Sequence, residues 1–217
     1  MTKNFRIIFL LSFLLLSVKS YGQNQTGILP QLNGGFKLAE GLELDSKVES
    51  RYIFQEKEFE RLDFENVLIK DLNTKHSIGV GYLLRRQDGR FLHRAIQQFT
   101  LSAEHNAIKM SHRFRTDQSF RDNEKPKYRL RYRFSLEMPL KGPEVDPNEY
   151  YITFENEYLG SLQESEGNFE IRLFPAIGYH FSDTYQLETG IDYRAEGLIH
   201  SKTVHKLFLN VAFNLNF

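Results

Sequence analysis

The C-terminal stretch 203–217 constrains the fold of this chain more than any other segment. Apolar residues occupy every second position from Leu207 to Phe217, and the positions between them are mostly Asn or Ala. Because alternate side chains of a β-strand point to opposite sides, this pattern predicts a strand with one hydrocarbon face and one mostly amide face. Similar alternation recurs upstream, and no helical period persists after residue 22. The sequence therefore predicts a single all-β domain.

The strictest alternation lies in the middle of the chain. From Tyr128 to Met138, apolar residues alternate with Arg129, Arg131 and Arg133. Counting comparable segments from Leu42 onward gives about ten strands, with a range of ten to twelve, and single-chain bacterial barrels usually have an even number. The stretch 23–41 is polar and is expected to be a periplasmic lead-in. A short first strand at 34–38 would make the count odd.

The N-terminal residues have the features of a targeting segment. Lys3 and Arg6 precede a nearly continuous apolar run over 7–16, and small residues at Ser20 and Gly22 precede a cleavage position ahead of residue 23. This is the pattern of a cleavable secretory signal peptide. The expected organisation is a signal peptide over 1–22, a lead-in over 23–41 and a barrel over 42–217.

Alternation alone fits both a soluble barrel, whose apolar face points inward, and a membrane barrel, whose apolar face points outward. Export, strands of about ten residues or more and the terminal Phe217 favour the membrane barrel, although the chain has no tryptophan. Aromatic residues near strand ends favour it too, as in interfacial girdles: Tyr128, Tyr150, Tyr158, Tyr179, Phe181, Tyr185 and Tyr193. We expect an antiparallel transmembrane β-barrel in the cell outer membrane, with the apolar stripes facing lipid.

The orientation follows from a C-terminus placed in the periplasm. The connections near Asp122, Gln163 and Gly197 are then expected on the outer side. Those near Asn106, Pro143 and Asp183 are expected on the periplasmic side. Longer polar loops, including one over 160–168, are expected to alternate with short turns. The last strand is expected to close the barrel by pairing near Leu42.

Three residues of the last strand, Phe213, Leu215 and Phe217, resemble the C-terminal recognition signal of bacterial outer-membrane barrels. The expected partners are therefore outer-membrane lipid and the barrel-assembly machinery, through this strand. Lys+Arg and Asp+Glu both number 28, so no overall positive field points to nucleic acid.

The polar faces of the central strands carry the residues best suited to chemistry. They form a candidate luminal charge ladder of arginines and carboxylates: Arg113, Arg115, Asp117, Arg129, Arg131, Arg133, Glu155, Glu157, Arg172, Asp192 and Arg194. The planar fork of arginine pairs bidentately with carboxylates. We interpret the ladder as ion pairs that fill a narrow lumen. The alternative is a narrow passive channel or binding site for small anionic solutes.

An enzyme is the third reading, and the sequence gives it little support. Ser111 and His112 are adjacent on a strand and so point to opposite faces, which prevents a direct nucleophile–base pair. The other histidines lack metal-ligand spacing, and Asp45, Asp63 and Asp117 form no evident dyad. We expect no enzyme activity, catalytic residue, metal or cofactor. A surface enzyme on the outer rim stays open as the alternative.

Several blocks of the chain resemble a known family. They are HRFRTDQ and RLRYR within 93–142, FENEYL within 150–159 and IGYHFSD within 169–194. They are similar to a Gram-negative family of outer-membrane proteins known as domain of unknown function 2490. The resemblance is weakest before Leu42. It implies a membrane barrel and no substrate, cofactor or catalytic residue.

Overall fold

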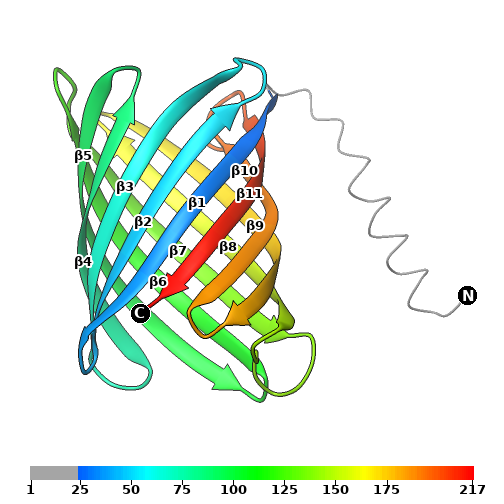
Figure 1. Ribbon diagram of the computed structural model, residues 1–217. Helices are drawn as coiled ribbons and strands as arrows, with labels where there is room; N and C mark the ends of the chain where they lie inside the picture. Colours follow the sequence, from blue (N-terminus) through cyan, green and yellow to red (C-terminus); the bar gives the residue numbers. More distant parts are fainter. Residues whose placement is uncertain (1–23) are drawn as a thin grey trace, which may run out of the picture.

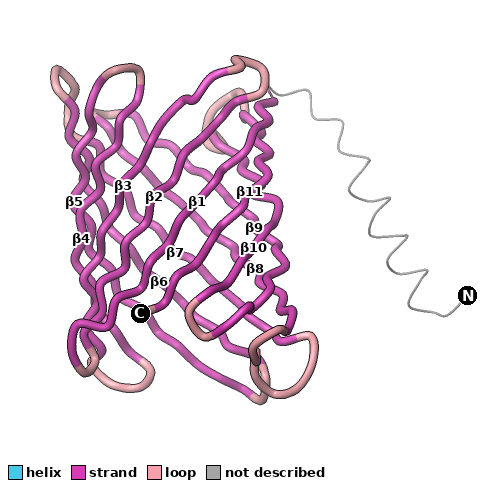
Figure 2. Tube along the Cα trace, viewed as in Figure 1, coloured by secondary structure: helices cyan, strands magenta, loops and turns pink. Residues whose placement is uncertain are grey.

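The computed structural model describes residues 24–217, and the expected signal peptide over 1–22 lies outside this part of the chain. Figures 1 and 2 show one closed barrel of strongly tilted strands. The strands are β1 (Asn24–Ala39), β2 (Leu42–Ile53), β3 (Glu58–Asp71), β4 (His76–Gln87), β5 (Arg90–His105), β6 (Ile108–Arg121), β7 (Lys127–Pro139), β8 (Glu149–Gln163), β9 (Glu166–Ser182), β10 (Tyr185–Glu196) and β11 (Val204–Asn216). No helix in the described residues is long and apolar enough to cross a membrane.

The strand order confirms the all-β barrel and gives eleven strands, within the expected range. Consecutive strands pair antiparallel, but β1 and β11 close the barrel with a parallel ladder that runs from Asn24 beside His205 to Gly35 beside Asn216. Two expectations are corrected here: the ladder is not antiparallel throughout, and β11 does not pair near Leu42. With an odd number of strands, the first strand begins at one end of the barrel and the last finishes at the other (Figure 1). We call these the N-end and the C-end.

The stretch expected as a lead-in forms the full strand β1, and not only the short segment 34–38. Pro30 and the glycines around it, such as Gly27, hid this strand, because proline cannot donate to a ladder and glycine weakens strands. The pairing of β1 with β2 skips Leu29 and Pro30, whereas the pairing with β11 continues through both. Pairing with β11 therefore keeps this stretch in a strand although its sequence is typical of a loop.

Five of the ten connections between described strands are tight two-residue turns. Asp88 and Gly89 both have positive φ values, of 53° and 71°, which suits the two-residue turn that Asp-Gly favours. The loop expected over 160–168 is wrong, because β8 and β9 extend to a two-residue turn at Glu164 and Ser165. Extended pairing between the strands satisfies backbone groups that a loop would leave to solvent.

The turns group at the two ends as the pattern predicted, but their lengths do not distinguish the ends. The connections near Asn106, Pro143 and Asp183 lie at the C-end, and those near Asp122 and Gly197 lie at the N-end. The connection over 140–148, at the C-end, is the longest between any two described strands. Expected alternation of long loops with short turns is therefore not found.

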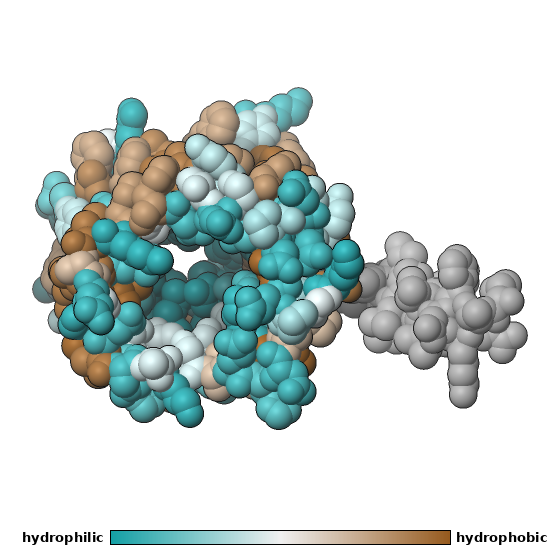
Figure 3. Space-filling model, turned by 60° about the horizontal axis from the view of Figure 1, so that its bottom comes forward, coloured by the Kyte–Doolittle hydropathy of each residue, from teal (hydrophilic) through white to brown (hydrophobic). Residues whose placement is uncertain are grey.

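The two faces of the wall differ sharply in polarity. In β11, Leu207 and Leu209 are 45% and 43% exposed on the outer face, whereas Phe208 and Asn210 are buried on the inner face. Figure 3, in which the C-end comes forward, shows a hollow lined by hydrophilic residues inside flanks with extensive hydrophobic surface. The apolar stripes of the sequence therefore mark the outside of the barrel.

The last residue is anchored to the first strand. The backbone N–H of Phe217 donates to the carbonyl of Gly35 at 2.8 Å, and Lys37 N–H donates back to the Phe217 carbonyl at 3.0 Å. The Phe217 ring stacks on Phe36 with centroids 5.3 Å apart. The terminal aromatic thus completes the β1–β11 seam at the C-end.

This seam can be tested by cross-linking, because the chain contains no cysteine. The Asn33 and Asn214 side chains on neighbouring strands are hydrogen-bonded at 2.7 Å. We expect Asn33→Cys with Asn214→Cys to form a disulfide under mild oxidation, seen as a reductant-sensitive mobility shift in denaturing gels.

The matched control pairs Asn214→Cys with Lys47→Cys, which lies one strand further on, beside Asn33. Two strand spacings separate these positions by about 9.5 Å, beyond the reach of a disulfide. Cross-linking of the control pair alone would mean that β1 does not lie between β2 and β11.

Candidate functional site

The candidate site is the inner face of the barrel, and strand register places the predicted ladder there. Arg113 and Arg115 on β6 lie beside Arg133 and Arg131 on β7. Arg133 in turn lies beside Glu157 on β8. These residues are paired directly across neighbouring strands and are spaced by two along each strand, so all their side chains point to the same face of the wall.

Asp117 is the most deeply buried charge of the ladder. Its side chain is 1% exposed, and three guanidiniums surround it: Arg129 at 2.5 Å, Arg131 at 3.2 Å and Arg94 at 3.5 Å. A carboxylate removed from water needs such partners, because an unpaired buried charge is strongly destabilising. Asp117 therefore holds β5, β6 and β7 together from inside.

Glu157 has the same role two strands further on, on β8. It lies 3.1 Å from Arg172 and 3.7 Å from both Arg113 and Arg131. Arg131 therefore bridges Glu157 and Asp117. These contacts link four consecutive strands, β6 to β9, through shared carboxylates.

The remaining ladder residues also form ion pairs. Arg133 contacts Glu155 at 2.7 Å, and Arg194 contacts Asp192 at 2.7 Å. Arg115 contacts Glu65 on β3 at 2.8 Å. Since β4 and β5 lie between β3 and β6 in the wall, this last contact crosses the interior. All eleven predicted ladder residues thus form ion pairs inside the barrel, some within the Asp117–Glu157 cluster and others, such as Arg133 with Glu155 and Arg194 with Asp192, as separate pairs.

The sequence interpretation missed a second group of interior charges on β2 to β5: Glu49, Arg51, Arg61, Asp63, Glu65, Arg85 and Arg94. Asp63 is held by Arg85 through two hydrogen bonds of 2.7 and 2.6 Å. Alternation from residue 43 to 51 already placed Glu49 and Arg51 opposite the apolar stripe. Arg85 likewise falls opposite the apolar stripe of Ile78, Val80, Tyr82 and Leu84, so alternation could have found it too.

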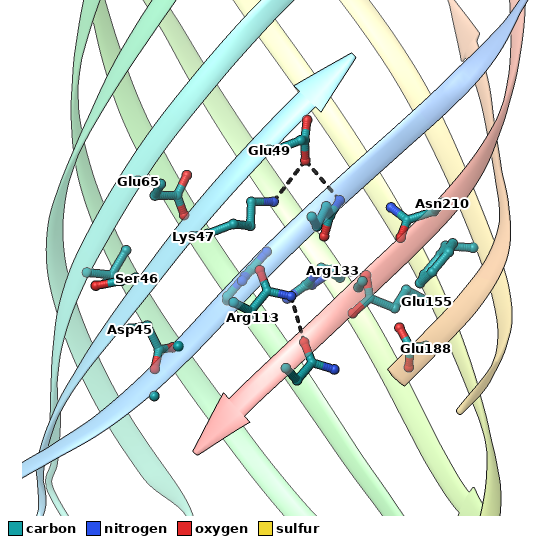
Figure 4. A pocket seen from close by; sticks show the side chains of 18 of the residues that line it. Asp45, Ser46, Lys47, Glu49, Glu65, Arg113, Arg133, Glu155, Glu188 and Asn210 are labelled. Atoms are coloured by element: carbon teal, nitrogen blue, oxygen red, sulfur yellow. Dashed lines mark hydrogen bonds and ion pairs between the residues drawn. The ribbon is translucent and has the colours of Figure 1, made fainter. Parts of the chain in front are cut away.

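A cavity of about 470 Å³ occupies the middle of the interior and extends towards the C-end. Figure 4 shows the labelled side chains around it, including Asp45, Glu65, Arg113 and Glu188, which project from strands on several sides. Lys47 donates to Glu49 here at 3.0 Å. The lining mixes carboxylates, guanidiniums and amides, so it suits polar contents.

A second cavity of about 320 Å³ lies at the N-end, and residues near the N-end termini of the strands line it. We call it the N-end chamber. Arg172 and Arg194 line both cavities. Its walls are rich in Arg and Lys, in contrast to the mixed lining of the central cavity.

The residues considered for catalysis are not brought together. His112 Nδ1 is 2.8 Å from the Tyr132 hydroxyl, on the outer face, whereas Ser111 lines a groove near the C-end. Among residues 24–217, no group of His, Cys, Asp and Glu is arranged to hold a metal ion.

Comparison with known proteins assigns the chain to a family. A model of the family described as a protein of unknown function, DUF2490, matches residues 26–204. The chain belongs to this family. The match begins in β1 and ends at the first residue of β11, so it includes the whole charge ladder. No curated protein and no solved structure matches the chain.

The role of Asp117 in stability can be measured with Asp117→Asn. The change leaves three guanidiniums around a neutral side chain. We therefore expect the free energy of unfolding to fall by about 3–5 kcal/mol. Urea unfolding of the purified protein in detergent, followed by circular dichroism, would measure it.

The matched control is Asp122→Asn, at an exposed turn position only a few residues away. We expect it to change stability by less than about 0.5 kcal/mol. Equal effects of the two substitutions would show that the Asp117 cluster contributes no special stability.

Proposed function

We propose that the protein is an integral outer-membrane β-barrel without enzyme activity, whose lumen is largely filled by an Arg/Glu/Asp network. The observation that supports this most is the polarity of the wall. Leu130 is 62% exposed and Val80 61% exposed on the outside, while Arg51 and Asp117 are 3% and 1% exposed inside. A soluble barrel has the opposite arrangement.

The outer surface also suits a bilayer in detail. Phe59, Phe91 and Tyr128 are exposed at the second position of strands that begin at the N-end. Tyr150 and Tyr185 are exposed at the start of strands that begin at the C-end. Aromatic rings at both rims, with aliphatic residues between, match the interfacial girdles of membrane barrels.

Exposing this outer surface to water would be energetically unfavourable. Soluble monomers rarely expose contiguous apolar patches larger than a few hundred Å², and apolar area in water costs about 25 cal/mol per Å². Strands of 12 to 17 residues exceed the roughly 9–11 that a tilted membrane crossing needs. Lipid contact around the barrel would remove the apolar band from water.

The contacts inside favour a lumen that does not conduct. Arg115 and Glu65 join across the interior, and Asp117 and Glu157 each bind several arginines from neighbouring strands. Small barrels are commonly filled by side chains, and an ion would have to displace these pairs. A filled lumen also explains why the interior charges are paired with one another.

The orientation proposed for the protein places the C-end in the periplasm. On intact cells, Ser165→Cys at the N-end turn should react with a membrane-impermeant thiol reagent. Asp183→Cys at the C-end turn should react only after the outer membrane is permeabilised. The reverse pattern would invert the orientation, and labelling of both positions on intact cells would argue against an outer-membrane barrel.

Conductance tests the filled lumen separately. In planar bilayers, we expect the purified protein to show no steady single-channel current, because wall-to-wall ion pairs block the path. A steady anion-selective current that is abolished by Arg131→Glu would contradict this expectation and favour a channel. The Lys109→Glu variant, near the C-end mouth, controls for a general effect of charge reversal.

A further inference from the structure

The N-end chamber has an excess of positive charge on its walls. Eight cationic residues line it, against three carboxylates: Arg51, Arg61, Arg85, Lys127, Arg129, Arg172, Arg194 and Lys206, against Glu60, Glu170 and Glu196. Each of the three carboxylates is already paired, with Arg51, Arg172 and Lys206 at 3.2, 2.7 and 2.6 Å. The rest of the lining cations must find neutralising partners elsewhere.

Carboxylates behind the lining supply only part of that neutralisation, because they are shared. Asp117 serves Arg129 together with two other arginines. Asp63 serves both Arg61 and Arg85, and Glu49 serves both Arg61 and Lys47. Arg194 has its own partner, Asp192, at 2.7 Å. Lys127 forms no ion pair within 4.0 Å among the described residues. The chamber thus keeps uncompensated positive charge in a place largely removed from water.

Several guanidinium donors of the chamber also lack hydrogen-bond partners within the described chain. Nε and Nη2 of Arg51 are unpaired, and so is Nη2 of Arg129. Arg51 is 3% exposed, and its guanidinium lies over the Phe208 ring at 4.7 Å. Buried donors without acceptors are costly, so an oxygen-rich ligand that accepted from them after a small side-chain shift would be stabilised.

The opposite end of the barrel has the opposite balance. The groove near the C-end is lined by Glu104, Glu137, Glu155 and Glu188, against only Lys75 and Lys109. A charge gradient along a low-dielectric interior concentrates anions at its positive end. The two ends of the lumen are therefore not equivalent for a charged solute.

We infer that the N-end chamber is a binding site for a small multivalent oxyanion, one that carries two or more phosphate or carboxylate groups. Arginine forks pair with both groups bidentately, and Lys127 adds a point charge. A cavity of about 320 Å³ has room for a solute of the size of pyrophosphate or citrate. The inference rests on the arginine-rich face being the interior, as in the proposed function, but not on whether the lumen conducts.

The test is calorimetric titration of the purified chain in detergent with pyrophosphate, orthophosphate and citrate. We expect one-to-one binding of pyrophosphate that weakens as salt is raised, and weaker binding of orthophosphate. Citrate that binds as tightly as pyrophosphate would also support the inference, because the site is assigned to multivalent oxyanions. Absence of binding by both multivalent anions would overturn it.

Two lysines give a matched comparison. Lys127→Gln should weaken pyrophosphate binding about tenfold or more, as expected for loss of one charge-assisted hydrogen bond, while Lys127→Arg should bind nearly as the parent does. Lys109→Gln removes the same charge near the C-end and should leave the affinity unchanged. Equal weakening by Lys127→Gln and Lys109→Gln would indicate nonspecific attraction and overturn the assignment.

Arg51→Lys provides a second variant that keeps the charge and removes the planar fork. We expect weaker pyrophosphate binding with a folded barrel, checked by the heat-dependent mobility of folded barrels in gels. Unchanged affinity would contradict a site built on the Arg51 fork. Because titration in detergent needs neither a membrane orientation nor a conducting path, its result is independent of the labelling and conductance experiments, and the variants assign the binding to the chamber.

Discussion

The parallel ladder between β1 and β11 is the contact on which the rest of the structure depends. Without it the sheet would have two open edges and no interior. Closure turns alternate positions of every strand into an inside and an outside. Only then can Asp117 on β6, with a side chain 1% exposed, be surrounded by three guanidiniums from the two neighbouring strands, β5 and β7. The charge network is a consequence of the closed wall, and it stabilises that wall in return.

Sharing of carboxylates explains how the interior holds so many arginines. An isolated pair would satisfy one charge with another, but Asp117 and Glu157 each lie between guanidiniums of several strands. A shared carboxylate restrains the strands relative to one another, and it leaves donors and positive charge in excess nearby. At the N-end, where fewer carboxylates line the cavity, this excess is largest.

Strand alternation was enough to predict the β-barrel class and to sort the eleven ladder residues onto one face of their strands, because both depend only on parity within a strand. That this face is the inner one did not follow from parity and needed the evidence for export and the terminal Phe217. Alternation failed where parity was masked. Pro30 and Gly27 made β1 resemble a loop. Contacts across the interior, such as Arg115 with Glu65, depend on barrel closure and could not be read from neighbouring strands.

The seam and the N-end chamber are in contact through Phe208 of β11, which pairs with β1 and lies under two arginines of the chamber lining. A Cβ at Gly27 would lie 2.1 Å from the Tyr52 carbonyl oxygen and 3.1 Å from the Phe208 ring, so only glycine lets β1 pass there. Phe208, fully buried beside it, supports the guanidiniums of Arg51 and Arg194 at 4.7 and 5.4 Å. Since an aromatic face favours a nearby cation, inserting β1 between β2 and β11 both closes the barrel and sets the spacing of two chamber arginines. A substitution that loosened the β1–β11 seam would therefore displace Arg51 and Arg194 in the N-end chamber before it affected the ladder residues nearer the C-end.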